Sequence, residues 1–133
     1  MKKALLIAVV FCFIAALAFA QGDTTSAPVT ASVPVAGQTL ILKGDIIDNM
    51  CADAHKDSLA DFVKTHTKQC AIAPGCIESG YSIFADGKLY KFDKDSSAKV
   101  AEFLKKEDSN LQVMINAKDV NGELSLISIE NQK

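Results

Sequence analysis

The sequence lacks the short motifs that identify several classes of enzyme and cofactor protein. Its 133 residues contain no Cys-x-x-Cys pair, no Cys-x-x-Cys-His haem attachment, no glycine-rich phosphate loop and no Gly-x-Ser-x-Gly elbow. Each motif supplies the groups that its chemistry needs at a fixed spacing, so these absences argue against thioredoxin-like, haem, phosphate-loop and α/β-hydrolase functions. We therefore predict no catalytic residues.

Long apolar runs are absent after residue 20, and the run before it is typical of an export signal. Two lysines open the chain, apolar residues follow over 4–17, and Ala18-Phe19-Ala20 has the small-x-small pattern of a cleavage site. The run is at the lower limit for a bilayer-spanning helix, and no basic flank follows it. We expect residues 1–20 to be a signal peptide whose removal leaves a chain that begins near Gln21, has no membrane span and resides in a bacterial periplasm or outside the cell.

Basic residues are too few and too dispersed for nucleic-acid binding. The chain has 14 Lys+Arg against 16 Asp+Glu, and 14 minus the two signal lysines leaves 12, a net charge of -4 for the mature chain. Binding to a polyanion depends on clustered Lys and Arg that displace counterions. We expect an envelope protein or a small ligand as the partner, and no nucleic acid.

The rest of the chain divides into a linker and one domain. Residues 21–38 are rich in Thr, Ser, Ala and Pro without an apolar period, as in a flexible linker. Residues 39–133 are enough for one small domain. Within that domain, residues 49–79 are predicted to be an insertion that carries both histidines and three of the four cysteines.

Alternating apolar residues and turn dipeptides predict five strands and one helix outside the insertion. The predicted elements are a strand over 39–48, a hairpin over 81–93, a helix over 96–107 that its serines cap, and a hairpin over 111–130. Asp86-Gly87 and Asn121-Gly122 tolerate the positive φ angles of tight hairpin turns. The apolar phase shifts between Leu126 and Ile127, which predicts a β-bulge there.

This order predicts a mainly β fold with a helical insertion, an OB-like (oligonucleotide/oligosaccharide-binding) five-stranded, partly open barrel. An α+β fold, in which one helix covers an open antiparallel sheet, fits the same order. Neither fold indicates a function by itself, because function depends on the site that a fold carries.

The insertion has a Cys/His pattern that suits a metal ion. Cys51 and His55 are four residues apart, His66 and Cys70 are also four apart, and Cys76 follows. Residues four apart lie on one face of a helix, so two helices could present both pairs to one tetrahedral ion. Thiolates and imidazoles together suit zinc or copper.

A disulfide is the competing interpretation, and an oxidising compartment favours it. Metal-binding cysteines are usually two to four residues apart, whereas these are farther apart. Pairing Cys51 with Cys70 or Cys76 would close a loop of roughly 20 to 25 residues, which stabilises a domain by about 3 kcal/mol on the chain-entropy model. Pairing Cys70 with Cys76 would close a smaller loop. Any pairing leaves one thiol for exchange chemistry or another partner.

The segments "GDIIDNMCADAH", "HTKQCAIAPGC" and "GYSIFADGKLYKFD" carry a family resemblance. Their order resembles that of small exported bacterial proteins of uncharacterised function, in which a strand ends in Asp-x-x-Cys, a Cys/His insertion follows, and a hairpin with Asp-Gly-Lys-x-Tyr leads into an OB-like remainder. The resemblance implies the same architecture for residues 39 to about 130 and implies no activity. Cys70 and Cys76 are farther apart here than in that pattern.

Tyr81 and Tyr90 are weaker candidates, for a surface that stacks on sugars or bases. Aromatic residues in a small hairpin more often belong to the core or to cross-strand pairs. Taken together, the patterns predict an exported, non-catalytic envelope binding or accessory module with a disulfide-stapled insertion. A periplasmic metal-binding protein and a thiol-exchange protein are the alternatives.

Overall fold

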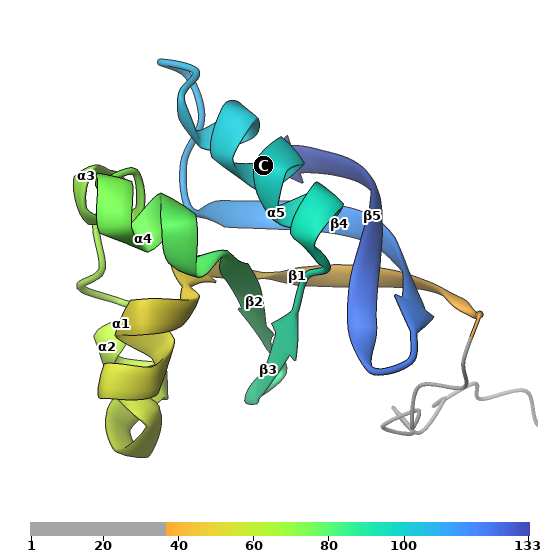
Figure 1. Ribbon diagram of the computed structural model, residues 1–133, viewed down its shortest axis with the longest axis horizontal. Coiled ribbons are helices and arrows are strands. Elements are labelled where there is room, and N and C mark those ends of the chain that lie inside the picture. Colours follow the sequence, from red (N-terminus) through yellow and green to blue (C-terminus); the bar gives the residue numbers. More distant parts are fainter. Residues whose placement is uncertain (1–36) are drawn as a thin grey trace, which may run out of the picture. The chain divides into compact units, whose positions relative to one another are not determined.

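The computed structural model describes residues 37–133. The predicted signal peptide, and all but the last two residues of the predicted linker, lie outside this range. The strands are β1 (Thr39–Asp48), β2 (Tyr81–Ala85), β3 (Lys88–Lys91), β4 (Gln112–Val120) and β5 (Glu123–Asn131) (Figure 1). The helices are α1 (Asn49–Ala54), α2 (Leu59–Phe62), α3 (Lys68–Ala71), α4 (Pro74–Ser79) and α5 (Lys94–Leu104), with a 3-10 turn, η1, at Lys56–Ser58.

The strands form one sheet in the order β3-β2-β1-β4-β5, and all paired neighbours are antiparallel. A single parallel bridge between Phe92 and Leu124 brings the chain just past β3 next to β5. The two edges of the sheet therefore approach each other without closing. This confirms the predicted mainly β fold with a helical insertion, and it is consistent with an open, barrel-like sheet.

Strand β1 changes partners along its length, and a glycine makes this possible. Its first part, up to Asp45, pairs with β4, and its last part, from Asp45, pairs with β2. A Cβ atom on Gly44 would overlap the backbone carbonyl oxygen of Phe84. Glycine is common where another backbone approaches closely or where a strand bends at the corner of a barrel. Gly44 thus allows β1 to pair with both β4 and β2.

Both predicted hairpin turns and the predicted bulge are confirmed. Asp86-Gly87 has φ angles of 50° and 74°, and Asn121-Gly122 has 56° and 87°, as tight hairpin turns of this kind require. On β5, Leu126 pairs with Ala117 and Ser128 pairs with Asn116, so Ile127 has no residue opposite it. The extra residue turns Ile127 outward, where it is 55% exposed.

Helix α5 forms where a helix was predicted, but the expected serine cap is wrong. Asp93 is the cap, because its carboxylate accepts the N–H of Ser96 at 2.7 Å. The two serines are buried instead, and their hydroxyl oxygens accept backbone N–H groups of the sheet. Ser96 accepts from Leu126 at 2.8 Å and Ser97 accepts from Tyr81 at 3.1 Å. These bonds attach α5 to β5 and to the start of β2.

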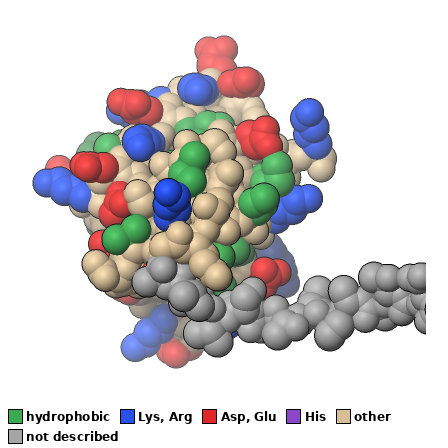
Figure 2. Space-filling view, turned by 90° about the vertical axis from the view of Figure 1, so that its right-hand side faces the viewer, with side chains coloured by type: hydrophobic (Ala, Val, Ile, Leu, Met, Phe, Trp, Pro, Cys, Tyr) green, Lys and Arg blue, Asp and Glu red, His purple; other side chains and the backbone are tan. Residues whose placement is uncertain are grey.

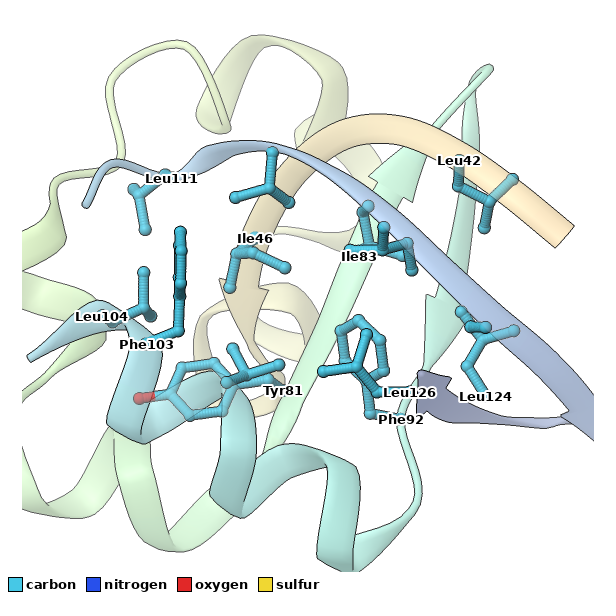
Figure 3. Close-up of a cluster of buried hydrophobic side chains, with 14 of the residues drawn as sticks. Leu42, Ile46, Tyr81, Ile83, Phe92, Phe103, Leu104, Leu111, Leu124 and Leu126 are labelled. Atoms are coloured by element: carbon cyan, nitrogen blue, oxygen red, sulfur yellow. The ribbon is translucent and has the colours of Figure 1, made fainter. Parts of the chain in front are cut away.

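The apolar side chains divide into a large core and a small second cluster. The large core lies between the sheet and α5 and includes the residues drawn in Figure 3, among them Ile46, Ile83 and Phe92. The second cluster consists of Ile47, Ala52, Leu59 and Val63, and it lies between β1 and the insertion. No helix in the described part of the chain is long and apolar enough to cross a membrane. Lysines and acidic residues are interspersed on the face shown in Figure 2.

Candidate metal centre in the helical insertion

Each of the three described cysteines is the third residue of a short helix: Cys51 in α1, Cys70 in α3 and Cys76 in α4. Asp48 caps α1 by accepting the N–H of Cys51 at 2.9 Å, and Thr67 caps α3 by accepting the N–H of Cys70 at 3.3 Å. Helix α4 begins with a proline, which suits the first turn of a helix. A cap three residues earlier therefore holds the backbone of Cys51 and of Cys70 in place.

These helices bring the three cysteines together with His66 and Asp48. One ligand atom each of Cys51, His66 and Cys70 lies within 4.8 Å of the others, and the same holds for Asp48, Cys51 and Cys76. Cys51 belongs to both groups, so its sulfur lies at the centre of the cluster. We call these five residues the Cys/His cluster.

The imidazole of His66 is the most unusual group in the cluster. Its side chain is 1% exposed, and its Nε2 lies 3.2 Å from Oδ2 of the fully buried Asp48. Neither ring nitrogen has a hydrogen-bond partner within the described residues, and neither does Oδ2 of Asp48. Buried polar groups are nearly always partnered, because an unpaired one costs free energy. A buried imidazole that is unsatisfied beside thiols is therefore a candidate metal ligand.

His55, by contrast, lies outside both ligand groups. Its exposed ring stacks on Phe62 with a centroid separation of 3.7 Å and an interplanar angle of 8°. Helix α1 ends at Ala54, one residue before His55, so the predicted pairing of Cys51 with His55 on one helical face is wrong.

The pairing of His66 with Cys70 on one helical face is also wrong, because His66 precedes the cap of α3. The two side chains nevertheless meet within 4.8 Å, as the metal hypothesis required. Asp48 was not predicted to be a member of the site. Its signal was the Asp-x-x-Cys spacing, which places a capping carboxylate beside a thiol in the first turn of α1.

The three cysteines are free thiols in the structure. The predicted disulfide is therefore not formed, although Cys51 has both Cys70 and Cys76 within 4.8 Å. A disulfide needs a sulfur separation of about 2.05 Å, so either pairing would require the helices to shift.

The thiols differ in accessibility and in ionisation. Burial raises the pKa of Cys51 to about 12, and the neighbouring Asp48 carboxylate contributes to the rise. The same two causes, in the same order, raise the pKa of Cys76. Cys70 is exposed to solvent. At neutral pH, the metal-free protein holds neutral thiols at Cys51 and Cys76, so binding of a metal to their thiolates would release protons.

Polar contacts attach the insertion to the sheet. The hydroxyl of Tyr81 donates to the carbonyl oxygen of Ala71 at 2.7 Å, the hydroxyl of Ser82 donates to Oδ1 of Asn49 at 2.6 Å, and Nδ2 of Asn49 donates to the carbonyl oxygen of Ser79 at 2.8 Å. These contacts link α1, α3 and α4 to β2.

Tyr81 is fully buried, so it cannot belong to the predicted surface for stacking, and that assignment is wrong. Its ring lies in the large core (Figure 3). Tyr90 is half-buried, packs against the same core and pairs with Ile83 across the hairpin. Both residues support the packing of the hairpin.

An open groove of about 520 Å³ lies between the insertion and the β2–β3 hairpin. Its floor includes Leu59, Phe84 and Leu89, and its lining also includes the carboxylates Asp53 and Asp57. Leu89 is 42% exposed. The members of the Cys/His cluster do not line this groove.

The described residues form a small β domain with an open, barrel-like sheet and a helical insertion that brings together side chains able to ligate a metal ion. No protein-family model matches the chain, and searches of curated proteins and of solved structures find no match. The family resemblance of its motifs stays a prediction.

Proposed function

We propose that this protein is an exported metal-binding protein that holds one zinc or copper(I) ion in its Cys/His cluster. The observation that carries the proposal is His66, whose buried ring nitrogens have no hydrogen-bond partner among the described residues and which lies within 4.8 Å of two thiols. A metal ion would satisfy a ring nitrogen and would be bound by the thiols that lie next to the ring. Soft thiolate ligands with an imidazole are the donors that zinc and copper(I) prefer.

The ligand set that fits best is Cys51, His66, Cys70 and Cys76. Three cysteines and one histidine make a closed tetrahedral site, the usual form of a structural zinc site. Zinc–sulfur bonds of about 2.3 Å place two ligand sulfurs about 3.7 Å apart in a tetrahedron. Cys51 lies within 4.8 Å of both other sulfurs, so each would need to approach Cys51 by about 1 Å at most, and Cys76 would also need to move towards His66 and Cys70, with which it shares no ligand group.

Asp48 would position His66 and would not need to bind the ion. Its Oδ2 is 3.2 Å from Nε2 of the imidazole. A ligating histidine commonly directs its second ring nitrogen to a carboxylate, which fixes the orientation of the ring. In this arrangement Nε2 donates to Asp48 and Nδ1 is left for the metal.

The bound ion would join three helices that have little apolar packing of their own. Helices α1, α3 and α4 each contribute one cysteine, and they have four to six residues each. Helices this short are not stable alone, and they depend on tertiary contacts. We infer that metal binding stabilises the insertion and supports no catalysis.

A competition titration tests the proposal. Cys12, the fourth cysteine, lies in the predicted signal peptide. The full chain with Cys12→Ser, reduced and freed of metal, is titrated with Zn(II) and separately with Cu(I) against a chelator of known affinity. We expect one ion per chain and a loss of affinity of about 100-fold or more in His66→Ala, since a direct ligand should matter at least as much as a residue that only hydrogen-bonds to a ligand. His55→Ala is the matched histidine control and should bind as the wild type does. Equal losses in the two variants, or no binding by the wild type, would refute the proposal.

The second candidate is the predicted accessory module with a disulfide-stapled insertion. It is favoured by the nearness of Cys51 to Cys70 and Cys76, and the groove beside the hairpin would be its binding surface. Alkylation of the denatured protein without reduction distinguishes the candidates. A staple leaves one alkylated thiol among Cys51, Cys70 and Cys76, whereas a metal site leaves three once the ion is chelated.

A further inference from the structure

The two most exposed cysteines of the Cys/His cluster differ in solvent exposure, and this difference suits thiol–disulfide exchange. Cys70 is exposed and Cys51 is half-buried, with their sulfurs within 4.8 Å of each other. We infer that the metal-free protein reduces low-molecular-mass disulfides, with Cys70 as the attacking thiol and Cys51 as the resolving thiol. This activity goes beyond metal binding and does not depend on it.

Cys70 is the entry point because the other thiols are shielded. Cys76 is 7% exposed, and Cys51 is less exposed than Cys70. Thiol–disulfide exchange requires the attacking sulfur to reach the disulfide along the bond between its two sulfurs. Of the three described cysteines, Cys70 is the most exposed to solvent, so we expect a molecule in solution to reach it first.

Cys51 is close enough to complete the exchange. Its sulfur must move from within 4.8 Å to about 2.05 Å from that of Cys70. Helix α3 carries Cys70 and consists of four residues. Its main attachments to the rest of the fold are the Tyr81 hydroxyl on Ala71 and the Lys68 ammonium on the carbonyl oxygens of Lys106 and Ser109. A short helix held at its ends by side chains can shift more readily than the sheet.

The reaction is balanced in two steps. In the first, the Cys70 sulfur bonds to one sulfur of the external disulfide, the external S–S bond breaks, and the departing sulfur takes up the Cys70 proton. In the second, the Cys51 sulfur bonds to the Cys70 sulfur, the mixed disulfide breaks, and the second departing sulfur takes up the Cys51 proton. Two protein thiols are oxidised to one disulfide, and one external disulfide is reduced to two thiols.

Metal binding and exchange exclude each other, because both use Cys51 and Cys70. An internal disulfide removes two ligands from the proposed metal site. A chelator must therefore be present in the exchange assay, and failure of the metal proposal would leave the assay unaffected.

The test uses the full chain with Cys12→Ser, reduced, desalted and kept in chelator. It is mixed with the chromogenic disulfide 5,5′-dithiobis(2-nitrobenzoate) and, in parallel, with oxidised glutathione. We expect the wild type to release two thiol equivalents per chain rapidly, to retain no label and to yield a Cys51–Cys70 bridge on peptide mass mapping. Cys51→Ser should stop at a mixed disulfide on Cys70, and Cys70→Ser should react about tenfold more slowly or worse, since access controls the rate. His55→Ala, at a residue outside both ligand groups, is the control and should behave as the wild type does.

Mapping of the bridge in the wild type keeps the test independent of how well the variants fold. A wild-type protein that retains the label on Cys70, a bridge that includes Cys76, or an undiminished rate in Cys70→Ser would each overturn the inference.

Discussion

The β sheet and the helical insertion are held together in different ways. The sheet and α5 share a core of many buried apolar residues, and five strands satisfy one another's backbone groups. The insertion contributes Ala52, Leu59 and Val63 to a second cluster that includes Ile47 of β1, and it contributes Ala71 to the large core. In place of a larger core it has helix caps, a few hydrogen bonds to β2, and the Cys/His cluster. We expect the sheet to depend mainly on its own core and the insertion to depend more on these added links.

This difference explains why the polar residues of the insertion are buried. Asp48 and His66 lie almost completely out of water, at a free-energy cost that a small apolar cluster does not offset. A bound metal would give the buried His66 ring a partner, and it would crosslink α1, α3 and α4. The following substitutions test whether the two regions respond as differently as their packing suggests.

We expect the largest effect from truncation of the main core. Ile83 is fully buried in the middle of β2, and Ile83→Ala should lower the free energy of unfolding of the whole domain by about 3–5 kcal/mol through lost burial and a cavity. Leu59→Ala, in the second cluster, should cost about 2 kcal/mol because the insertion can collapse around it. Urea unfolding of the two variants checks this order. Equal losses would mean that both regions share one core.

Removal of the Asp48 charge should weaken metal binding with little change in the fold. Asp48→Asn keeps a side-chain oxygen for capping α1 but loses the carboxylate beside His66. We expect zinc affinity to fall by about 10- to 100-fold, as it does when other groups that hydrogen-bond to a ligating histidine are replaced. Asp93→Asn, which alters the cap of α5 in the same way, is the control and should leave zinc affinity unchanged. A loss of zinc affinity in Asp93→Asn, or no loss in Asp48→Asn, would mean that the Asp48 carboxylate has no specific role at the metal site.

Loss of the Tyr81 hydroxyl should loosen the insertion more than the sheet. Tyr81→Phe keeps the buried ring and leaves the carbonyl oxygen of Ala71 without its partner, which typically costs about 1–2 kcal/mol. Limited proteolysis in chelator should cut the variant faster within residues 49–79, with no new cuts in β4 or β5. Cleavage in the sheet at the same enhanced rate would show that the bond supports the whole domain.

Alkaline pH should destabilise the metal-free protein. Burial raises the pKa of Cys51 from 9.0 to about 12 and that of Tyr81 from 10.0 to about 12. The unfolded state therefore loses these protons first, so stability is fully present below pH 9 and declines as the pH rises towards 12. Urea midpoints between pH 8 and pH 11, in chelator and reductant, measure the decline. The double variant Cys51→Ser/Tyr81→Phe should show a shallower slope than the wild type, and an unchanged slope would assign the decline to other groups.

The sequence predicts the sheet well and the site only in part. Alternating residues and Asp-Gly or Asn-Gly turns specify strands locally, and even the bulge at Ile127 is visible as a phase shift. The insertion is predicted less well, because residues four apart share a face only within a continuous helix and the helices of the insertion are too short for that. Four-residue spacing selected His55, which lies past the end of α1, and overlooked Asp48, which the cap places beside Cys51.

Hydrogen exchange with and without one equivalent of zinc, on the reduced full chain with Cys12→Ser, tests most directly whether a metal holds the insertion together. We expect zinc to slow amide exchange across residues 49–79 and to leave exchange in β4 and β5 nearly unchanged. The His55→Ala variant should show the same protection, and the His66→Ala variant should lose it. Uniform protection of both regions, or none in the insertion, would contradict this explanation of the buried Cys/His cluster.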